Sequence, residues 1–85
     1  MPAKFLIINK PAKKNLRKLP IHVHIRIINS FDEVRKNPLL GEKLHGELQK
    51  AYKFRIGDYR IVYEFEAKAS LVTILKIEHR QGVYK

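Results

Sequence analysis

The sequence has 85 residues and no cysteine. A disulfide framework and a thiolate metal site are therefore excluded, and the fold has to be held together by packing alone. Such a chain suits a reducing, cytoplasmic compartment. Long hydrophobic runs are missing too, since none approaches the roughly 20 residues that span a bilayer. The short apolar stretch at Phe5–Ile8 precedes no cleavage-site pattern, so we expect a core strand there and not a signal peptide.

Acidic residues are also scarce. The chain has 8 Asp and Glu against 18 Lys and Arg, which gives a formal net charge of +10. On a small domain such a charge creates a potential of several kT and destabilises the compact state through self-repulsion. We therefore expect a function that uses the charge. The candidate binding partners are nucleic acid, an anionic membrane and an acidic protein. The alternative is a solubility surface, or the lysine-rich composition of a heat-loving host.

Several kinds of catalytic site find no support in the sequence. Gly41 and Gly46 are not followed by the Lys-Ser or Lys-Thr pair of a phosphate-binding loop. His22 and His24 have no evident third ligand, so we expect no metal site. No carboxylate pair stands out for acid–base work, and no serine nucleophile has a visible partner. We therefore expect no cofactor.

The N-terminal half predicts a strand and two helices within a single domain, residues 1–85, because no repeat or linker divides the chain. A strand at residues 3–8 is followed by Asn9-Lys10-Pro11, a typical helix start. The first helix has an apolar stripe on one side and a basic face on the other. The stripe is Ala12, Leu16 and Leu19, and the basic face is Lys13, Lys14, Arg17 and Lys18.

Residues 21–36 fit two patterns. Residues 21–27 alternate as a strand does, but the apolar residues also recur at helical spacing. The segment is too long for a typical strand, and Asn37-Pro38 would stop a helix. We therefore predict a second helix, with an apolar face formed by Ile21, Ile25, Ile28 and Phe31 that runs on to Val34.

The C-terminal third alternates in three runs joined by short turns, which predicts an antiparallel meander. The runs are residues 52–56, 59–65 and 71–77, the turns are Gly57-Asp58 and residues 67–70, and residues 39–50 before them predict a loop. With the first strand, the meander gives an α+β fold. We expect a small, mostly antiparallel sheet of about four strands with two N-terminal helices packed on one face.

The Gly57-Asp58 hairpin brings basic residues together. A two-residue loop places Arg55 opposite Arg60, and Lys53 shares their face. Because like charges directly opposite on a sheet are destabilising, the cluster suggests that an anion binds there, and paired arginines suit phosphate. The alternative is an ordinary solvated face that Glu64, Glu66 or Glu78 neutralises. The other face of the hairpin predicts core residues, namely Phe54, Ile56, Tyr59, Ile61, Tyr63 and Phe65.

The C-terminal residues His79, Arg80 and Tyr84 add a titratable group, a guanidinium and an aromatic ring. Whether Arg80 shares a face with Arg60 depends on the loop at residues 67–70. A four-residue loop puts them on opposite faces and a three-residue loop puts them together, and the sequence does not decide.

These segments resemble the RelE branch of the RelE/ParE toxin superfamily over nearly the whole chain. The resemblance is carried by Lys43-Leu44-His45-Gly46, the run from Tyr52 to Tyr63, His79-Arg80 and Val83-Tyr84, with Leu16–Pro20 and Asn37-Pro38 matching in placement. It implies a metal-independent endoribonuclease, the toxin of a type II toxin–antitoxin system, which cuts mRNA in the ribosomal A site. In such toxins the ribose 2′-hydroxyl attacks the neighbouring phosphate and leaves a cyclic phosphate and a free 5′-hydroxyl.

The resemblance also implies partners and residue roles. A cognate acidic antitoxin would wrap the toxin, which would be a monomer alone and part of a hetero-oligomer in the complex, with no membrane partner. Arg60 would stabilise the phosphorane charge, and Arg80 would act at the leaving oxygen. Lys53 and Arg55 lie on the strand that supplies basic catalytic residues, and Tyr84 would stack on a base or orient the substrate. The basic face of the first helix would hold ribosomal RNA.

Two departures from the family pattern matter. Arg55 stands where the family often has a second lysine, and a guanidinium is a poor proton-transfer group, so Lys53 is the better candidate base. His79 either shares the acid role or is a structural histidine at a strand end.

Two other functions stay open at this level. One is a ParE-like toxin that inhibits DNA gyrase, and the other is a basic RNA-binding module without activity. The nuclease hypothesis requires that Lys53, Arg60 and Arg80 converge and are not each neutralised by an acidic neighbour.

Overall fold

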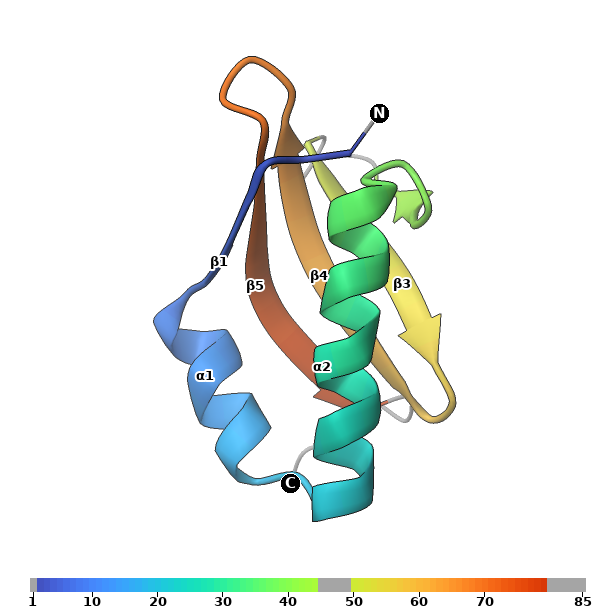
Figure 1. Ribbon diagram of the computed structural model, residues 1–85. Coiled ribbons are helices and arrows are strands. Elements are labelled where there is room, and N and C mark those ends of the chain that lie inside the picture. The colour runs from blue at the N-terminus through green and yellow to red at the C-terminus, as the bar shows by residue number, and fades with distance from the viewer. Residues whose placement is uncertain (1, 45–49, 80–85) are drawn as a thin grey trace.

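The computed structural model describes residues 2–44 and 50–79 and shows a twisted sheet with helices on one side (Figure 1). The elements in chain order are β1 (Phe5–Ile8), α1 (Lys10–Arg17), α2 (Ile21–Lys36), β2 (Glu42–Lys43), β3 (Ala51–Ile56), β4 (Tyr59–Glu66) and β5 (Leu71–His79). The predicted α+β fold is confirmed. The sheet has a fifth strand, β2, within the segment predicted as a loop.

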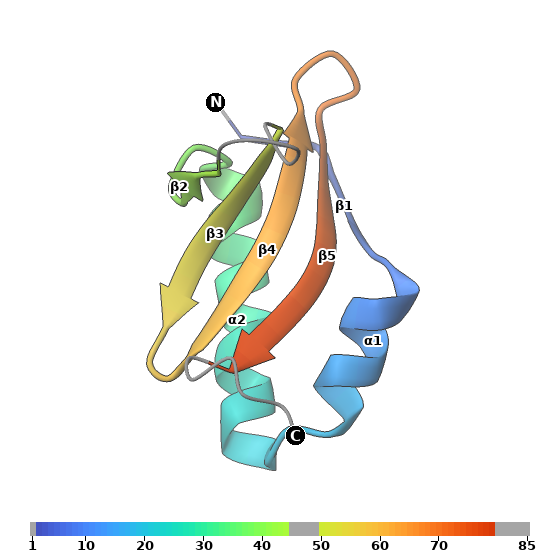
Figure 2. The same ribbon diagram turned by 180° about the vertical axis from the view of Figure 1, so that it is seen from behind.

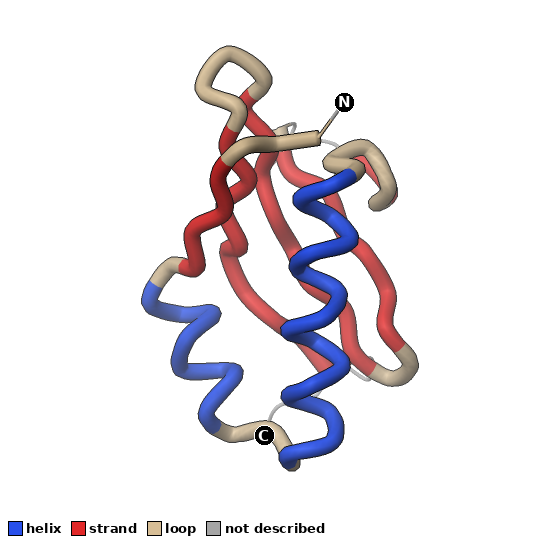
Figure 3. The backbone as a smooth tube through the Cα atoms, in the orientation of Figure 1, coloured by secondary structure: helices blue, strands red, loops and turns tan. Residues whose placement is uncertain are grey.

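The five strands are ordered β1-β5-β4-β3-β2. β1 is parallel to β5, and the other neighbours are antiparallel. Helix α2 crosses one face of the sheet (Figure 3), whereas the view from behind shows the other face with no described helix in front of it (Figure 2). We call this second surface the open face.

Helix α1 begins as predicted. Asn9 caps it, because Asn9 Oδ1 accepts a hydrogen bond from the N–H of Ala12 at 3.3 Å, and Pro11 lies in the first turn. Ala12 and Leu16 are buried in the core, which confirms the predicted stripe, and Leu19 packs against the core.

The same helix also covers part of an exposed sheet edge. β5 is longer than its partner β1, and α1 lies beside it where β1 has ended (Figure 1). There the N–H of Ile77 donates to Asn15 Oδ1 at 2.9 Å. An edge N–H that would otherwise invite another strand is thereby satisfied.

Helix α2 forms where it was predicted, but its expected apolar face is mostly wrong. Of the five residues, Phe31 and Val34 are buried, whereas Ile21, Ile25 and Ile28 are exposed by 70%, 53% and 42%. The buried positions are Ile27, Ser30, Phe31 and Val34, with Val23 packed against them. The helix has apolar residues on two sides, and only contact with the sheet decides which side enters the core.

The hairpin register is confirmed, with Ile56 opposite Tyr59 and Arg55 opposite Arg60. Gly57 has a φ of +59° at the first turn position, a conformation that favours glycine. All six predicted core residues of the hairpin lie in or against the hydrophobic core.

β5 contains a bulge that reverses its alternation. The loop at residues 67–70 has four residues, since Glu66 pairs with Leu71. Farther along, however, Tyr63 pairs with Ile74 and Val62 with Lys76, so Leu75 is an extra residue. The alternation assumed for a four-residue loop therefore fails beyond Leu75, and Glu78 pairs with Arg60. Arg80 itself lies outside the described residues.

Two substitutions on α2 test which face forms the core. Ile27→Ala should lower the free energy of unfolding by about 2 to 5 kcal/mol, because Ile27 is fully buried and its removal leaves a cavity. Ile25→Ala, the matched control, should change it by less than about 0.5 kcal/mol. Urea denaturation followed by circular dichroism measures both, and equal losses would contradict the assignment.

Candidate functional site: a cationic patch on the open face

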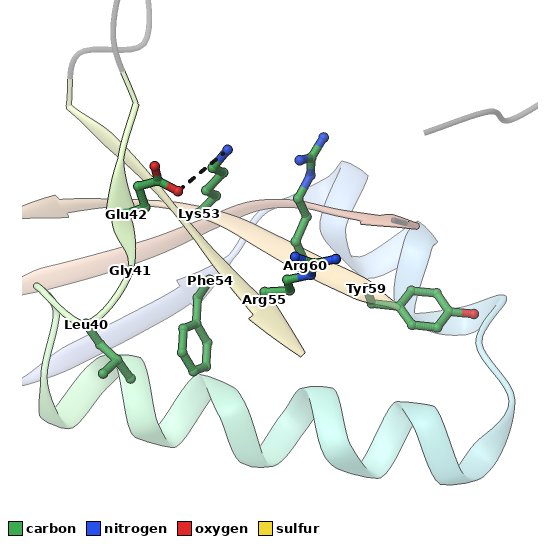
Figure 4. Close-up of a pocket in the computed structure, with 8 residues that line it drawn as sticks. All are labelled: Leu40, Gly41, Glu42, Lys53, Phe54, Arg55, Tyr59 and Arg60. Carbon is green, nitrogen blue, oxygen red and sulfur yellow. Dashed lines mark ion pairs between the residues drawn. The ribbon is translucent and has the colours of Figure 1, made fainter. Parts of the chain in front are cut away.

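The predicted basic cluster lies on the open face of the sheet. Lys53 on β3 and Arg60 on β4 project away from α2, whereas Leu40 and Phe54 lie on the α2 side (Figure 4). Strand alternation and the bulge add Lys76 of β5 to the same face. We call Lys53, Arg55, Arg60 and Lys76 the cationic patch.

Two adjoining pockets connect these cations. A depression of about 250 Å³ on the open face is lined by Leu44, Lys53, Arg60, Val62, Lys76 and Glu78. A second pocket of about 520 Å³ is lined by Leu40, Gly41, Glu42, Lys53, Phe54, Arg55, Tyr59 and Arg60 (Figure 4). Lys53 and Arg60 line both pockets, so a ligand in either one would meet these two side chains.

Glu78 links two of the cations. Its Oε1 accepts a hydrogen bond from Arg60 Nε at 2.8 Å, and its Oε2 lies 2.8 Å from Lys76 Nζ. Burial by itself would raise the pKa of Glu78, but the hydrogen bonds from Lys76 and Arg60 outweigh it and hold the pKa below its usual 4.5. Glu78 is thus a carboxylate that stays ionised between two cations.

Lys53 has a looser partner. Its Nζ lies 3.7 Å from Glu42 Oε1, and the Glu42 side chain is 76% exposed. A pair this exposed contributes little to stability, because water screens it and two flexible side chains lose entropy.

A buried tyrosine fixes the segment that carries Glu42. Tyr63 Oη donates to the carbonyl of Pro38 at 2.8 Å and accepts from the N–H of Gly41 at 2.9 Å. Burial raises the pKa of Tyr63. A Cβ on Gly41 would lie 2.7 Å from both the Lys53 carbonyl oxygen and Tyr63 Oη, so only glycine fits there.

His79 does not join the cationic patch. It pairs with Tyr59 across the strands, and the two rings meet edge to face with centroids 4.8 Å apart. This pair belongs to the face of the sheet opposite Arg60. His79 also lines a small pocket with Asn15, Lys18, Leu19, Tyr59 and Ile77.

The remaining predicted residues fall into two groups. Lys13, Lys14 and Arg17 on α1 and Lys18 at its C-cap are all exposed, as an RNA-binding face requires. Arg80 and Tyr84 lie outside the described residues. Within residues 2–44 and 50–79, no three His, Asp or Glu side chains group as metal ligands, and no helix is long and apolar enough to cross a membrane.

The requirement set for the nuclease hypothesis is met only in part. Lys53 and Arg60 share a surface and do not point apart, but each has a carboxylate neighbour. The alternative in which an acidic residue neutralises the cluster is therefore also partly correct, and the residue concerned is Glu78. The patch still has four cations against the two carboxylates of Glu42 and Glu78.

Sequence reasoning missed Lys76 and Glu42 as neighbours of the site. Lys76 was overlooked because a bulge, which leaves no clear mark in the sequence, decides its face. Glu42 was overlooked because its segment was interpreted as a loop. The lone Gly41 was the available signal, since a required glycine indicates close backbone approach.

Comparison with known proteins shows the family to which the chain belongs. The family model for the ParE toxin of the type II toxin–antitoxin system parDE matches residues 6–84. Toxin RelG of Mycobacterium tuberculosis is 30% identical over 76 residues, which are 87% of this chain and 87% of that protein. The chain therefore belongs to the RelE/ParE superfamily of toxins from type II toxin–antitoxin systems.

Solved structures indicate the branch of the superfamily to which the chain belongs. The toxin–antitoxin complex RelBE2 of Mycobacterium tuberculosis contains a chain that superposes with a TM-score of 0.83 at 27% identity, covering 94% of each chain. The isolated E. coli RelE toxin gives a TM-score of 0.77 at 27% identity, covering 88% of this chain and 82% of that one. Within the superfamily this is a RelE-family toxin.

The charge on Glu78 should make stability depend on pH. Because the pKa of Glu78 is lower in the folded than in the unfolded chain, its ion pairs stabilise the fold above the unfolded value and are lost as pH falls through the folded value. Glu78→Gln should therefore be less stable than the wild type near neutral pH, and the difference should shrink below pH 4.5. Urea denaturation across the acid range measures it, and a constant difference would contradict the assignment.

Proposed function

We propose that this toxin is a metal-independent endoribonuclease that cuts mRNA on the ribosome. One observation carries the proposal: Lys53 and Arg60, from adjacent strands, line both adjoining pockets together with Lys76 or Arg55. Cations that converge from separate strands suit a single phosphodiester group, whose negative charge increases in the transition state. The RelE relatives support the same assignment.

The proposed reaction is an internal transfer. The 2′-oxygen of a ribose loses its proton and attacks the adjacent phosphorus, and the bond from phosphorus to the 5′-oxygen breaks. The 5′-oxygen takes a proton from solvent, so that a cyclic phosphate and a 5′-hydroxyl result. Lys53 is the general base that takes the proton of the 2′-hydroxyl. Arg60 stabilises the charge on the phosphorane oxygens. Arg80, outside the described residues, supports the leaving oxygen as the family resemblance implies, and Tyr84 stacks on a base.

The carboxylates near the patch are compatible with this role. Glu42 is exposed and 3.7 Å from Lys53, so an RNA phosphate can replace it as a partner. Arg60 contacts Glu78 through Nε, which leaves the two terminal nitrogens of its fork to donate to a phosphate. The cations are therefore oriented by acidic neighbours and still available to an anion.

Two partners follow from the same proposal. Ribosomal RNA would contact the exposed basic face of α1, where four cations project from two helical turns. A cognate antitoxin is supported by the relatives, since the RelBE2 structure is a toxin–antitoxin complex. With a net charge of +10, this toxin is expected to bind an acidic antitoxin.

A second candidate is inhibition of DNA gyrase. The matching family model describes a ParE toxin, and the shared scaffold does not separate the two activities. The cationic patch favours the nuclease, because binding to a protein target does not require cations gathered around a pocket.

Arg60→Ala should abolish growth arrest when the toxin is expressed without antitoxin. The physical reason is the loss of the charge that stabilises the phosphorane, which should lower cleavage by about 100-fold or more. Mapping of mRNA 5′ ends after induction measures cleavage directly. Lys68→Ala removes the same charge from the β4–β5 turn and should leave both readouts unchanged. Wild-type toxicity of Arg60→Ala would contradict the assignment, and stalled replication with intact mRNA would favour gyrase.

Charge reversal on α1 tests the ribosome contact. Lys13→Glu combined with Lys14→Glu should weaken ribosome binding and reduce its dependence on salt, because fewer phosphate contacts release fewer counterions. Sedimentation with purified ribosomes across a salt series measures both. The matched control is Lys4→Glu with Lys68→Glu, which changes net charge equally at exposed positions away from α1. An equal loss in the control would mean that only net charge matters.

A further inference from the structure

Glu78 occupies a special place within the cationic patch. Each of its carboxylate oxygens meets a different cation, Oε1 with Arg60 of β4 and Oε2 with Lys76 of β5, both at 2.8 Å. The Glu78 side chain is 24% exposed, less than that of either partner. Glu78 is therefore less accessible to solvent than Arg60 and Lys76, and it holds both cations from the side of the sheet.

Glu78 contacts Arg60 at the Nε atom of the guanidinium group. Because Nε is engaged, the guanidinium plane is fixed at its base, and the two terminal nitrogens, which make no hydrogen bond within residues 2–44 and 50–79, face away from α2 (Figure 4). An unrestrained arginine samples many rotamers, and fixing them before the substrate binds removes an entropy loss from the reaction. Lys53 and Arg55 would otherwise repel this side chain toward solvent.

The bulge in β5 makes the arrangement possible. Without the extra residue Leu75, the four-residue loop would place Ile77 opposite Arg60 and turn Glu78 toward the helices. Bulges commonly redirect side chains near active sites. In this chain the bulge carries Glu78 and Lys76 together onto the open face.

We propose that Glu78 is a positioning residue that fixes the directions of Arg60 and Lys76 toward a bound phosphodiester. This role rests on the nuclease function proposed above. Glu78 acts through the two cations and takes no proton from the RNA. Its negative charge weakens the attraction of RNA to the patch and therefore lowers the affinity for RNA. By orienting the two cations, it raises the rate of the chemical step.

The simpler explanation is that Glu78 only relieves charge repulsion in the folded protein. The two explanations predict different effects of Glu78→Gln and Glu78→Ala. Both substitutions remove the charge, so relief of repulsion predicts equal effects. Glutamine, however, keeps one oxygen that can accept from Arg60 Nε, whereas alanine keeps none. Positioning therefore predicts cleavage activity in the order Glu, Gln, Ala.

The experiment measures cleavage of mRNA on programmed ribosomes by the full-length toxin. Glu78→Ala should lower kcat by about 10- to 100-fold without raising KM, because orientation is lost while RNA attraction increases. The kcat of Glu78→Gln should lie between that of the wild type and that of Glu78→Ala. Glu64→Ala is the matched control, since it removes the same charge from β4 on the same face and makes no ion pair with the described residues of the patch. The Nε–Hε signal of Arg60 in ¹⁵N NMR should be sharp in the wild type and broadened or lost in Glu78→Ala.

Each result is decisive. Equal kcat values for Glu78→Ala and wild type would overturn the inference, as would equal values for Gln and Ala or an equal loss in Glu64→Ala. Faster cleavage by Glu78→Ala would also overturn it, because the carboxylate would then be blocking the patch. If the wild type cuts no mRNA, the nuclease function fails, and the NMR signal still reports separately whether Glu78 orients Arg60.

Discussion

Repulsion between like charges is the constraint on which the site depends. Four cations share three neighbouring strands, and Arg55 stands directly opposite Arg60. Such pairs destabilise a sheet unless an anion lies near them. In this protein the anions are the carboxylates of Glu42 and Glu78. Glu42 lies 3.7 Å from Lys53, whereas Glu78 binds Arg60 more tightly, at 2.8 Å. The balance leaves an excess of positive charge on a surface with room for a phosphate.

Two backbone features bring these charges together. The bulge at Leu75 shifts β5 so that Glu78 pairs with Arg60. At the other edge, Tyr63 holds Pro38 and Gly41 and thereby fixes the short strand that carries Glu42. Tyr63 is fully buried, and both of its hydrogen bonds are to the backbone. Through these two hydrogen bonds the core holds the backbone that carries Glu42.

The helices leave the open face accessible. α2 fills the opposite face with Ile27, Phe31 and Val34, and α1 lies along β5 and protects part of its edge. Helix α1, which carries exposed cations, lies beside β5 at the edge of the sheet and not in front of the open face (Figures 1 and 2). A toxin that docks on ribosomal RNA with one surface and acts on mRNA with another would need this separation.

The sequence by itself determined the order of the elements apart from the short strand β2. It also determined the hairpin register and the meeting of Arg55 with Arg60, because alternation and a two-residue turn are local properties. It also determined the cap at Asn9 and the basic face of α1. The tertiary structure decided which side of α2 enters the core, since both sides are apolar and only packing against the sheet distinguishes them. It also decided that Lys76 and Glu78 share the face of Arg60 while His79 does not. One extra residue in a strand reverses every side chain beyond it, and its position depends on how β5 packs against both β4 and the helices.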